Sequence, residues 1–246
     1  MFKPEVTVFD GHAVLGRSLD ESMDIKTPVE LLEIMDRTGI ERALVYHRNA
    51  VMYNTLVGND EMMALVDGHA RLTPQHIFNM STDPLDKISQ NDTITSVRVF
   101  PKSHHYPITL PVVGKWLVWL QKAGIALWIS AEEIEVRDLY QMAKSYPDIN
   151  LVLSNMDYNH FASIWSLLPR IPNLHMELSR QETLNGVQMM VERAGARRLI
   201  FGSYFPDFDP AAYLSYLHQC RLPDDELQSI CHGNLTRLLT LAQRSV

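Results

Sequence analysis

Polar side chains follow several short apolar runs of this sequence, and a few have types suited to acid–base chemistry. His12, just after the first run, could act as a general base, because an imidazole has an ordinary pKa of about 6.5. Asp10 or Glu177 could orient its ring, although a hydrogen-bonded core histidine would explain the same residue without catalysis. Arg98 could hold a substrate carboxylate through two parallel hydrogen bonds. Alternatively, Arg98 could form an internal ion pair with Asp10, Asp157 or Glu177.

Further polar candidates follow later runs. Tyr204 is a poor base, since a phenol has an ordinary pKa near 10, but it could donate a hydrogen bond to a developing oxyanion or simply fill space. Ser130 has Glu133 three positions later, which would suit a helix-capping box. Asp157 could contact a ligand or cap the helix that follows it. The expected substrate-binding residues are Arg98, His47, Ser130, Asn155, Asp157 and Glu177.

The elements that would position these residues alternate along the chain. Eight short apolar runs read as buried strands: residues 6–10, 42–47, 76–80, 96–100, 126–129, 150–154, 174–178 and 198–202. Helical spacing follows Thr27 and covers residues 59–69, 111–123, 132–145, 158–168 and 181–194, with two further pieces after Asp209 and Pro223. Continuous apolar strands are typical of parallel sheets covered by helices on both faces. The pattern predicts an α/β fold, a (β/α)8 TIM barrel whose site lies at the carboxyl ends of the strands.

A doubly wound open sheet is the alternative, but no glycine-rich phosphate loop follows any of the runs. No linker or repeat divides the sequence, so one domain over residues 1–246 is expected. Thr27 and Glu30 have the spacing of a capping box around Pro28 at the first helical position.

Composition limits the classes of partner. A net charge of −7 and a pI of about 5.8, with no cluster of Lys or Arg, argue against nucleic acid. No apolar stretch of about 18 residues occurs, so no membrane association and a cytoplasmic location are expected. Cys220 and Cys231 are too few for a disulfide scaffold and are expected to be reduced. A small-molecule substrate is the expected partner. A homo-oligomer is possible, and the aromatic stretch Trp116–Trp119 could either form a subunit interface or pack on the barrel.

Several segments together resemble a known family. They are Phe9-Asp10-Gly11-His12, Val97-Arg98-Val99-Phe100-Pro101, Gly124-Ile125-Ala126-Leu127-Trp128-Ile129-Ser130, Phe201-Gly202-Ser203-Tyr204-Phe205-Pro206 and Gly233-Asn234. In order and spacing, the chain resembles the amidohydrolase-related family of the metal-dependent hydrolase superfamily. This resemblance implies a TIM barrel that hydrolyses, decarboxylates or opens lactones of small organic acids, usually through zinc or a similar divalent ion.

Most metal ligands that the resemblance implies are replaced here. Of the two histidines that the resemblance implies after the first strand, His12 is kept and the second is replaced by Val14. Two later histidines are replaced by Ser130 and Asn155. The aspartate after the last strand becomes Tyr204. A catalytic zinc needs about three protein ligands, so no metal is expected at these positions. Zinc or another divalent metal remains possible at a site rebuilt with His47 or the pair His104-His105.

Two functions are compatible with this pattern. The first is a hydrolase or lyase that acts on a small carboxylate- or lactone-bearing molecule without the usual metal. In it, His12 and Asp10 serve acid–base chemistry, Arg98 clamps the anion and Tyr204 donates a hydrogen bond. The second is an inactive barrel that binds a ligand or a protein. A pocket into which His12, Arg98 and Glu177 face would favour the enzyme, whereas a mouth closed by Tyr204, Trp128 and Phe205 would favour the binding protein.

Overall fold

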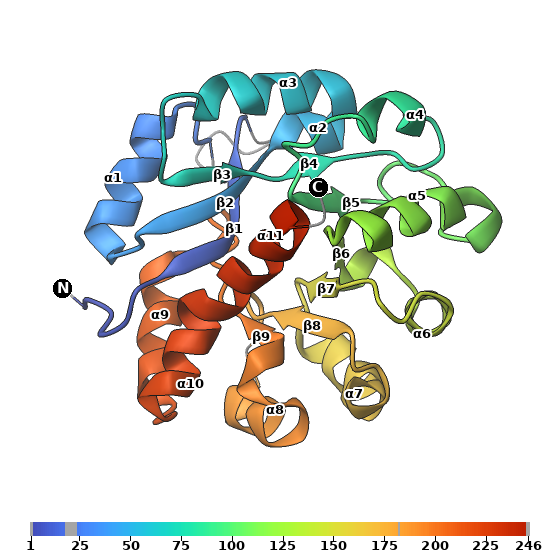
Figure 1. Cartoon of the computed structure of the whole chain (residues 1–246). Coiled ribbons are helices and arrows are strands. Elements are labelled where there is room, and N and C mark those ends of the chain that lie inside the picture. The colour runs from blue at the N-terminus through green and yellow to red at the C-terminus, as the bar shows by residue number, and fades with distance from the viewer. Residues whose placement is uncertain (1, 18–23, 182, 245–246) are drawn as a thin grey trace.

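The computed structural model describes residues 2–17, 24–181 and 183–244, and its strands form a barrel inside a ring of helices (Figure 1). All strand pairings are parallel. The strands are β1 (Phe9–Leu15), β2 (Arg42–His47), β3 (Leu72–Pro74), β4 (His76–Ile77), β5 (Ser96–Val99), β6 (Ala126–Ser130), β7 (Leu151–Ser154), β8 (Leu174–Glu177) and β9 (Leu199–Ile200). They are paired in sequence order as β1–β3 and β4–β9.

Backbone hydrogen bonds close these two sheets into one barrel. Only Gln75 separates β3 from β4, and its N–H donates to the carbonyl of Val45 in β2 at 2.8 Å. The two short strands therefore form the third side of an eight-sided barrel. On the other edge, β1 bonds to the segment that follows β9, where the Gly11 N–H donates to the Phe201 carbonyl at 2.9 Å. The predicted (β/α)8 fold is confirmed.

The helices agree with the predicted order, with two additions. They are α1 (Pro28–Thr38), α2 (Arg48–Met52), α3 (Thr55–Val66), α4 (Leu85–Ile88), α5 (Leu110–Ala123), α6 (Val136–Ser145), α7 (Tyr158–Leu167), α8 (Gly186–Ala194), α9 (Pro210–Gln219), α10 (Asp224–Gln228) and α11 (Asn234–Arg244). The capping box of Thr27 and Glu30 is present at α1. The short helices α2 and α4 were not expected, and α8 begins at Gly186 rather than at residue 181. Among the described residues, no helix is long and apolar enough to span a bilayer.

The first strand differs most from its prediction, because it runs over Phe9–Leu15 rather than ending at Asp10. Its pairing with β2 shifts between Asp10 and Ala13, so three steps along β1 match two along β2. Such a bulge redirects side chains and is common beside active sites. It interrupts the simple alternation that the sequence suggested for Asp10 and His12, and it places His12 within the barrel wall rather than in a loop.

Apolar side chains fill the barrel below its polar residues. Phe9 and Ala126, at the amino ends of β1 and β6, pack with Trp128 and with Leu235 and Leu238 of α11. Figure 1 shows α11 lying across this end of the barrel. A larger core fills the space between the strands and the outer helices. Because the amino end is plugged, a ligand can enter the barrel only from the carboxyl ends of the strands.

Candidate functional site

A layer of polar side chains crosses the barrel interior above the apolar plug. We call it the buried polar layer, and each of its residues is at most 2% exposed. Its members are Asp10, His12, Gln75, Arg98, Ser154 and Glu177. Buried polar groups are costly unless they are paired, so the partners of each group determine its state. The layer brings together four residues that the sequence suggested, namely Asp10, His12, Arg98 and Glu177.

His12 is held as a neutral imidazole. Burial first, and Arg98 second, lower its pKa to about 4. Its Nδ1 lies 2.9 Å from Oε2 of Glu177, so Nδ1 carries the hydrogen and donates to that carboxylate. The free lone pair on Nε2 then faces two donors, Nη1 of Arg98 at 3.2 Å and the hydroxyl of Tyr46 at 3.3 Å. Glu177, rather than Asp10, therefore orients the His12 ring.

Arg98 is a buried cation without a carboxylate partner. Its Nε donates to Gln75 at 2.7 Å, and Nη1 donates to Ser154 at 3.1 Å. The guanidinium lies 5.1 Å from the centres of both the Tyr46 and Trp128 rings, a distance at which ring faces attract cations. No described Asp or Glu lies within 4.0 Å of it, so the expected internal ion pair is wrong. Its Nη2 has no hydrogen-bond partner among the described residues.

Asp10 has a different set of partners. Its carboxylate accepts from the backbone N–H groups of His12 and Ser203, at 2.9 and 2.8 Å, and from the Ser203 hydroxyl at 2.5 Å. Burial raises its pKa to about 6 although these hydrogen bonds oppose the shift. Ser179 holds Glu177 in the same way, because its N–H and its hydroxyl both donate to the Glu177 carboxylate. The two carboxylates are thus fixed by one serine each.

These residues do not fit the divalent metal that the family resemblance implies. The lone pair of His12 that could bind a metal is met by the Arg98 guanidinium, a cation at hydrogen-bond distance. No set of three or more His, Cys, Asp or Glu in the described ranges is arranged to hold a metal. His47 instead pairs with Glu61, and His104 bonds through Nε2 to the Val51 carbonyl, so neither rebuilds a site around His12.

A pocket of about 210 Å³ lies at the carboxyl ends of the strands, directly above the buried polar layer. We call it the mouth pocket. Its walls are Val14, Tyr46, Arg48, Val51, Met52, Phe100, Ser103, Ser130, Glu132, Glu133, Asn155 and Tyr204. Tyr204 lies against His12, with the two rings tilted by 37° and their centres 4.6 Å apart, and Tyr46 covers Arg98. His12, Arg98 and Glu177 therefore lie behind two tyrosines and do not line the pocket themselves, so the arrangement expected to favour the enzyme is not found.

Three other expected residues reach this pocket. The Ser130 hydroxyl is buried and has no hydrogen-bond partner in the described part of the chain. The capping box expected with Glu133 is absent, because Glu133 accepts from Lys102 and Ser103 instead. Asn155 and Tyr204 both have a φ of 54°, a left-handed conformation that is uncommon for a residue with a side chain. Such backbone strain tends to persist where function requires it. Trp128, by contrast, lies in the plug beneath Arg98 and does not close the mouth.

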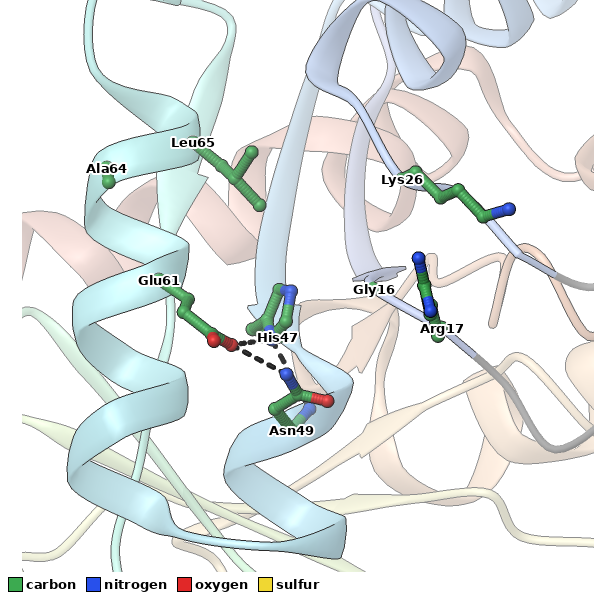
Figure 2. A pocket seen from close by; sticks show the side chains of 8 residues that line it. All are labelled: Gly16, Arg17, Lys26, His47, Asn49, Glu61, Ala64 and Leu65. Atoms are coloured by element: carbon green, nitrogen blue, oxygen red, sulfur yellow. Dashed lines mark hydrogen bonds and ion pairs between the residues drawn. The ribbon is translucent and has the colours of Figure 1, made fainter.

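Two expected substrate-binding residues lie elsewhere. Figure 2 shows His47 beside Glu61 and Asn49, in a separate pocket of about 450 Å³ between β2 and α3. Its Nδ1 lies 3.1 Å from Glu61, and burial lowers its pKa. Its side chain points away from the barrel interior because it follows Tyr46, and neighbouring strand residues face opposite sides. Asp157 caps α7 by accepting from two backbone N–H groups, which confirms the capping interpretation.

The sequence reasoning missed Tyr46, Arg48, Gln75 and Ser154. Tyr46 alternates with His47 at the end of β2, so the face of the strand could have identified it once His47 was seen to point outward. Gln75 is a buried polar residue between the short strands β3 and β4, outside every predicted strand, so no apolar run marks it in the sequence. Arg48 belongs to the unexpected helix α2, whose only start signal in the sequence is His47, the residue that caps it.

Comparison with known proteins gives both a family and a set of similar folds. A family model described as amidohydrolase matches residues 89–241, more than half of the chain. No curated protein matches the sequence. An uncharacterized TIM-barrel protein from Bordetella bronchiseptica is 16% identical, with 96% of this chain and 99% of that chain covered and a TM-score of 0.77.

Two further solved structures carry metals. A dihydroxybenzoic acid decarboxylase from a Polaromonas species, with bound manganese and the inhibitor 2-nitroresorcinol, is 11% identical; the alignment covers 96% of this chain and 97% of that chain at a TM-score of 0.79. An amidohydrolase from Burkholderia multivorans with bound zinc is 13% identical over 96% and 99% of the two chains, with a TM-score of 0.75. At these identities the likeness establishes the fold.

Proposed function

The chain belongs to the amidohydrolase family, and from this premise we propose that it is a hydrolase or lyase acting on a small carboxylate- or lactone-bearing molecule in the mouth pocket. The proposal includes catalysis without a metal. It is carried by one observation, the chain of contacts from Glu177 through His12 to the Tyr46 hydroxyl, because Tyr46 lines the mouth pocket. Decarboxylases of aromatic acids share this fold, which agrees with the substrate class.

Tyr46 is the group that connects the polar layer with a bound substrate. Burial raises its pKa well above the usual value, so the hydroxyl stays protonated. Its one hydrogen, which points to Nε2 of His12 in the unbound protein, turns to a substrate oxygen when the pocket is filled, while Arg98 continues to donate to Nε2. A donor fixed in a dry pocket stabilises negative charge that develops on a substrate oxygen. Arg98, close beneath the Tyr46 ring, favours that negative charge and any charge that moves onto the phenol oxygen.

Arg48 supplies the positive charge on the pocket wall. It lines the mouth pocket with a side chain 16% exposed and pairs with Asp207 at 2.9 Å. A substrate carboxylate would compete with Asp207 for this guanidinium. We therefore assign the binding of the substrate anion to Arg48 instead of Arg98, the residue that the sequence suggested. The Ser130 hydroxyl and the Asn155 amide offer neutral hydrogen bonds that orient the rest of the molecule.

The guanidinium of Arg98 also supports metal-free catalysis. It contributes a fixed positive charge at the point where the family resemblance implies a metal, next to Nε2 of His12. A fixed cation beside the reacting groups provides electrostatic stabilisation but no coordinated water. Electrostatic stabilisation by Arg48 and Arg98, with the Tyr46 hydroxyl as hydrogen-bond donor, is therefore the mechanism proposed for this pocket.

The test is a turnover screen with lactones and hydroxybenzoic acids, before and after dialysis against a chelator. We expect turnover that survives the chelator and that falls about 10²–10³-fold in Tyr46→Phe, the usual cost of one oxyanion donor. Tyr53→Phe is the matched control, because Tyr53 is 78% exposed and outside the mouth pocket. This control should keep full activity.

Each other outcome overturns a stated part of the proposal. Activity lost on chelation and restored by zinc or manganese would overturn the metal-free mechanism. Equal activity in Tyr46→Phe and Tyr53→Phe would remove Tyr46 from the mechanism. Binding of these acids without turnover would instead identify an inactive, ligand-binding barrel.

A further inference from the structure

We propose that a second pocket, separate from the mouth pocket, binds a neutral, ring-bearing carboxamide. This lateral pocket has a volume of about 360 Å³ and lies between the segment after β8 and helix α9. Its walls are Ser179, Gln181, Thr183, Leu184, Ser203, Phe208, Asp209, Ala212, Tyr213 and Tyr216. It shares no wall residue with the mouth pocket, so the inference does not rest on the proposed function.

The polar part of the lateral pocket contains an unsatisfied amide. Gln181 is only 1% exposed, yet neither Nε2 nor Oε1 of its side chain has a hydrogen-bond partner among the described residues. The hydroxyls of Thr183 and Tyr213 are likewise buried without partners there. Leaving a buried polar group unpaired costs about 1–3 kcal/mol each, so such a cluster requires an explanation. A bound molecule that pairs with these groups provides one.

The Gln181 amide is also fixed in direction. It packs directly on Gly186 at the start of α8, and a Cβ at that position would overlap the amide nitrogen. A primary amide held in this way presents one donor and one acceptor side by side. The complementary group is a carboxamide or a lactam, which presents an acceptor and a donor at the same spacing. A carboxylate has no donor for Oε1, and an ammonium group has no acceptor for Nε2.

The remaining walls select the body of the ligand. Tyr213 and Tyr216 have ring centres 5.5 Å apart, and Phe208 borders the opening with 40% of its surface exposed. These rings offer apolar and aromatic contact to a flat ring system. No Lys or Arg lines the pocket, and its carboxylate, Asp209, already caps α9. An anionic ligand would therefore lack a counterion, and the one carboxylate is engaged at the helix end, which favours a neutral molecule.

The test uses benzamide, benzoate and benzylamine, which share a ring and differ in the polar end. Titration followed by NMR should show saturable shifts of the Gln181 side-chain amide with benzamide, and of the Thr183 and Gly186 backbone amides, which are also present in variants without the glutamine. Benzoate and benzylamine should bind at least about tenfold more weakly, since each loses one of the two hydrogen bonds. Tyr46→Phe, in the mouth pocket, is the matched control and should bind benzamide as the wild type does.

Two variants separate binding from folding. Gln181→Met keeps the length of the side chain and removes both unpartnered atoms, so it should lose benzamide binding at least tenfold without any drop in Tm. Ala212→Phe, at an exposed position of α9, should block the opening from outside. The inference is overturned if benzamide gives no saturable shift at millimolar concentration, if benzoate shifts the amides of the lateral pocket equally well, or if both variants bind benzamide like the wild type.

Discussion

At the scale of single residues, a neutral histidine, His12, lies at the centre of this barrel between a carboxylate and a guanidinium group. Glu177 holds the Nδ1 hydrogen of His12, and Arg98 approaches the opposite nitrogen. If the His12 ring were protonated, its charge would be buried, and Nε2 would have no lone pair to accept from the Arg98 guanidinium. Both effects agree with the lowered pKa of His12. In the proposed mechanism, His12 therefore acts through Tyr46 rather than by touching a substrate in the mouth pocket.

Asp10 gives a prediction about pH. Its folded pKa of about 6 lies above the ordinary value of 3.8, so the protonated form is favoured by folding. The stability that Asp10 contributes is complete below pH 3.8 and is lost as the pH rises through 6. We expect the free energy of unfolding of the wild type to fall by about 3 kcal/mol relative to Asp10→Asn between pH 3.5 and 7. Urea unfolding of both proteins across that range measures the difference. A constant difference would contradict the raised pKa.

The types of these residues could be predicted from sequence, but their partners could not. Asp10, His12, Arg98 and Glu177 were identified because polar residues interrupt apolar strands. The role of Tyr46 depends on which face of β2 points inward, and that is decided by packing across the barrel. The choice of Glu177 over Asp10 as the partner of His12 depends on the bulge in β1, which leaves no local signal in the sequence.

At the scale of elements, one close contact fixes the wall of the mouth pocket. Gly58 of α3 packs against the backbone of Ala50 in α2, and a Cβ there would collide with the Ala50 nitrogen. The helix α2 carries Arg48, Val51 and Met52 into the pocket, so its position depends on this glycine. Repulsion between two backbones is not relieved by rotating a side chain.

Gly58→Ala should therefore lower the free energy of unfolding by about 1–3 kcal/mol, the usual cost of overpacking. Gly114→Ala in α5 is the matched control, because the nearest atom to its Cβ is the flexible tip of Tyr146 at 3.3 Å. That change should raise stability by up to about 1 kcal/mol, since alanine favours the helix. Chemical unfolding compares the two, and a Gly58→Ala protein as stable as the wild type would disprove the close contact as a constraint.

Long elements were predictable and short ones were not. The strand β2 and the helices α5 and α7 lie within a residue of their predicted bounds because their apolar periodicity is clear. Helices α2 and α4 have only 5 and 4 residues, too few for a periodic pattern to develop. The late start of α8 reflects the turn at Thr183, whose carbonyl accepts from Gly186.

At the scale of the whole molecule, α11 completes the barrel by closing its amino end. Leu238 is 1% exposed and packs with residues of several strands in the plug. Leu238→Ala should lower the free energy of unfolding by about 2–5 kcal/mol, because the rigid barrel cannot collapse around the cavity. Leu56→Ala, at a leucine 39% exposed, should cost less than about 1 kcal/mol. Equal losses in thermal or urea unfolding would contradict the role of α11 as a plug.

The architecture itself was the most predictable property. Strand and helix order, the parallel pairing and the location of the mouth at the carboxyl ends follow from patterns repeated along the whole chain. One domain over residues 1–246, the assembly state and the location in the cell stay predictions.

The buried guanidinium of Arg98 determines how the protein obtains the positive charge at the centre of its barrel. A metal ion must be acquired from the surroundings, competes with other ions for its site and can be removed, whereas a side chain is delivered with every copy that is translated. The positive charge in the centre of this barrel is 0% exposed and covalently attached. Every folded copy therefore carries that charge at full occupancy, even where trace metals are scarce.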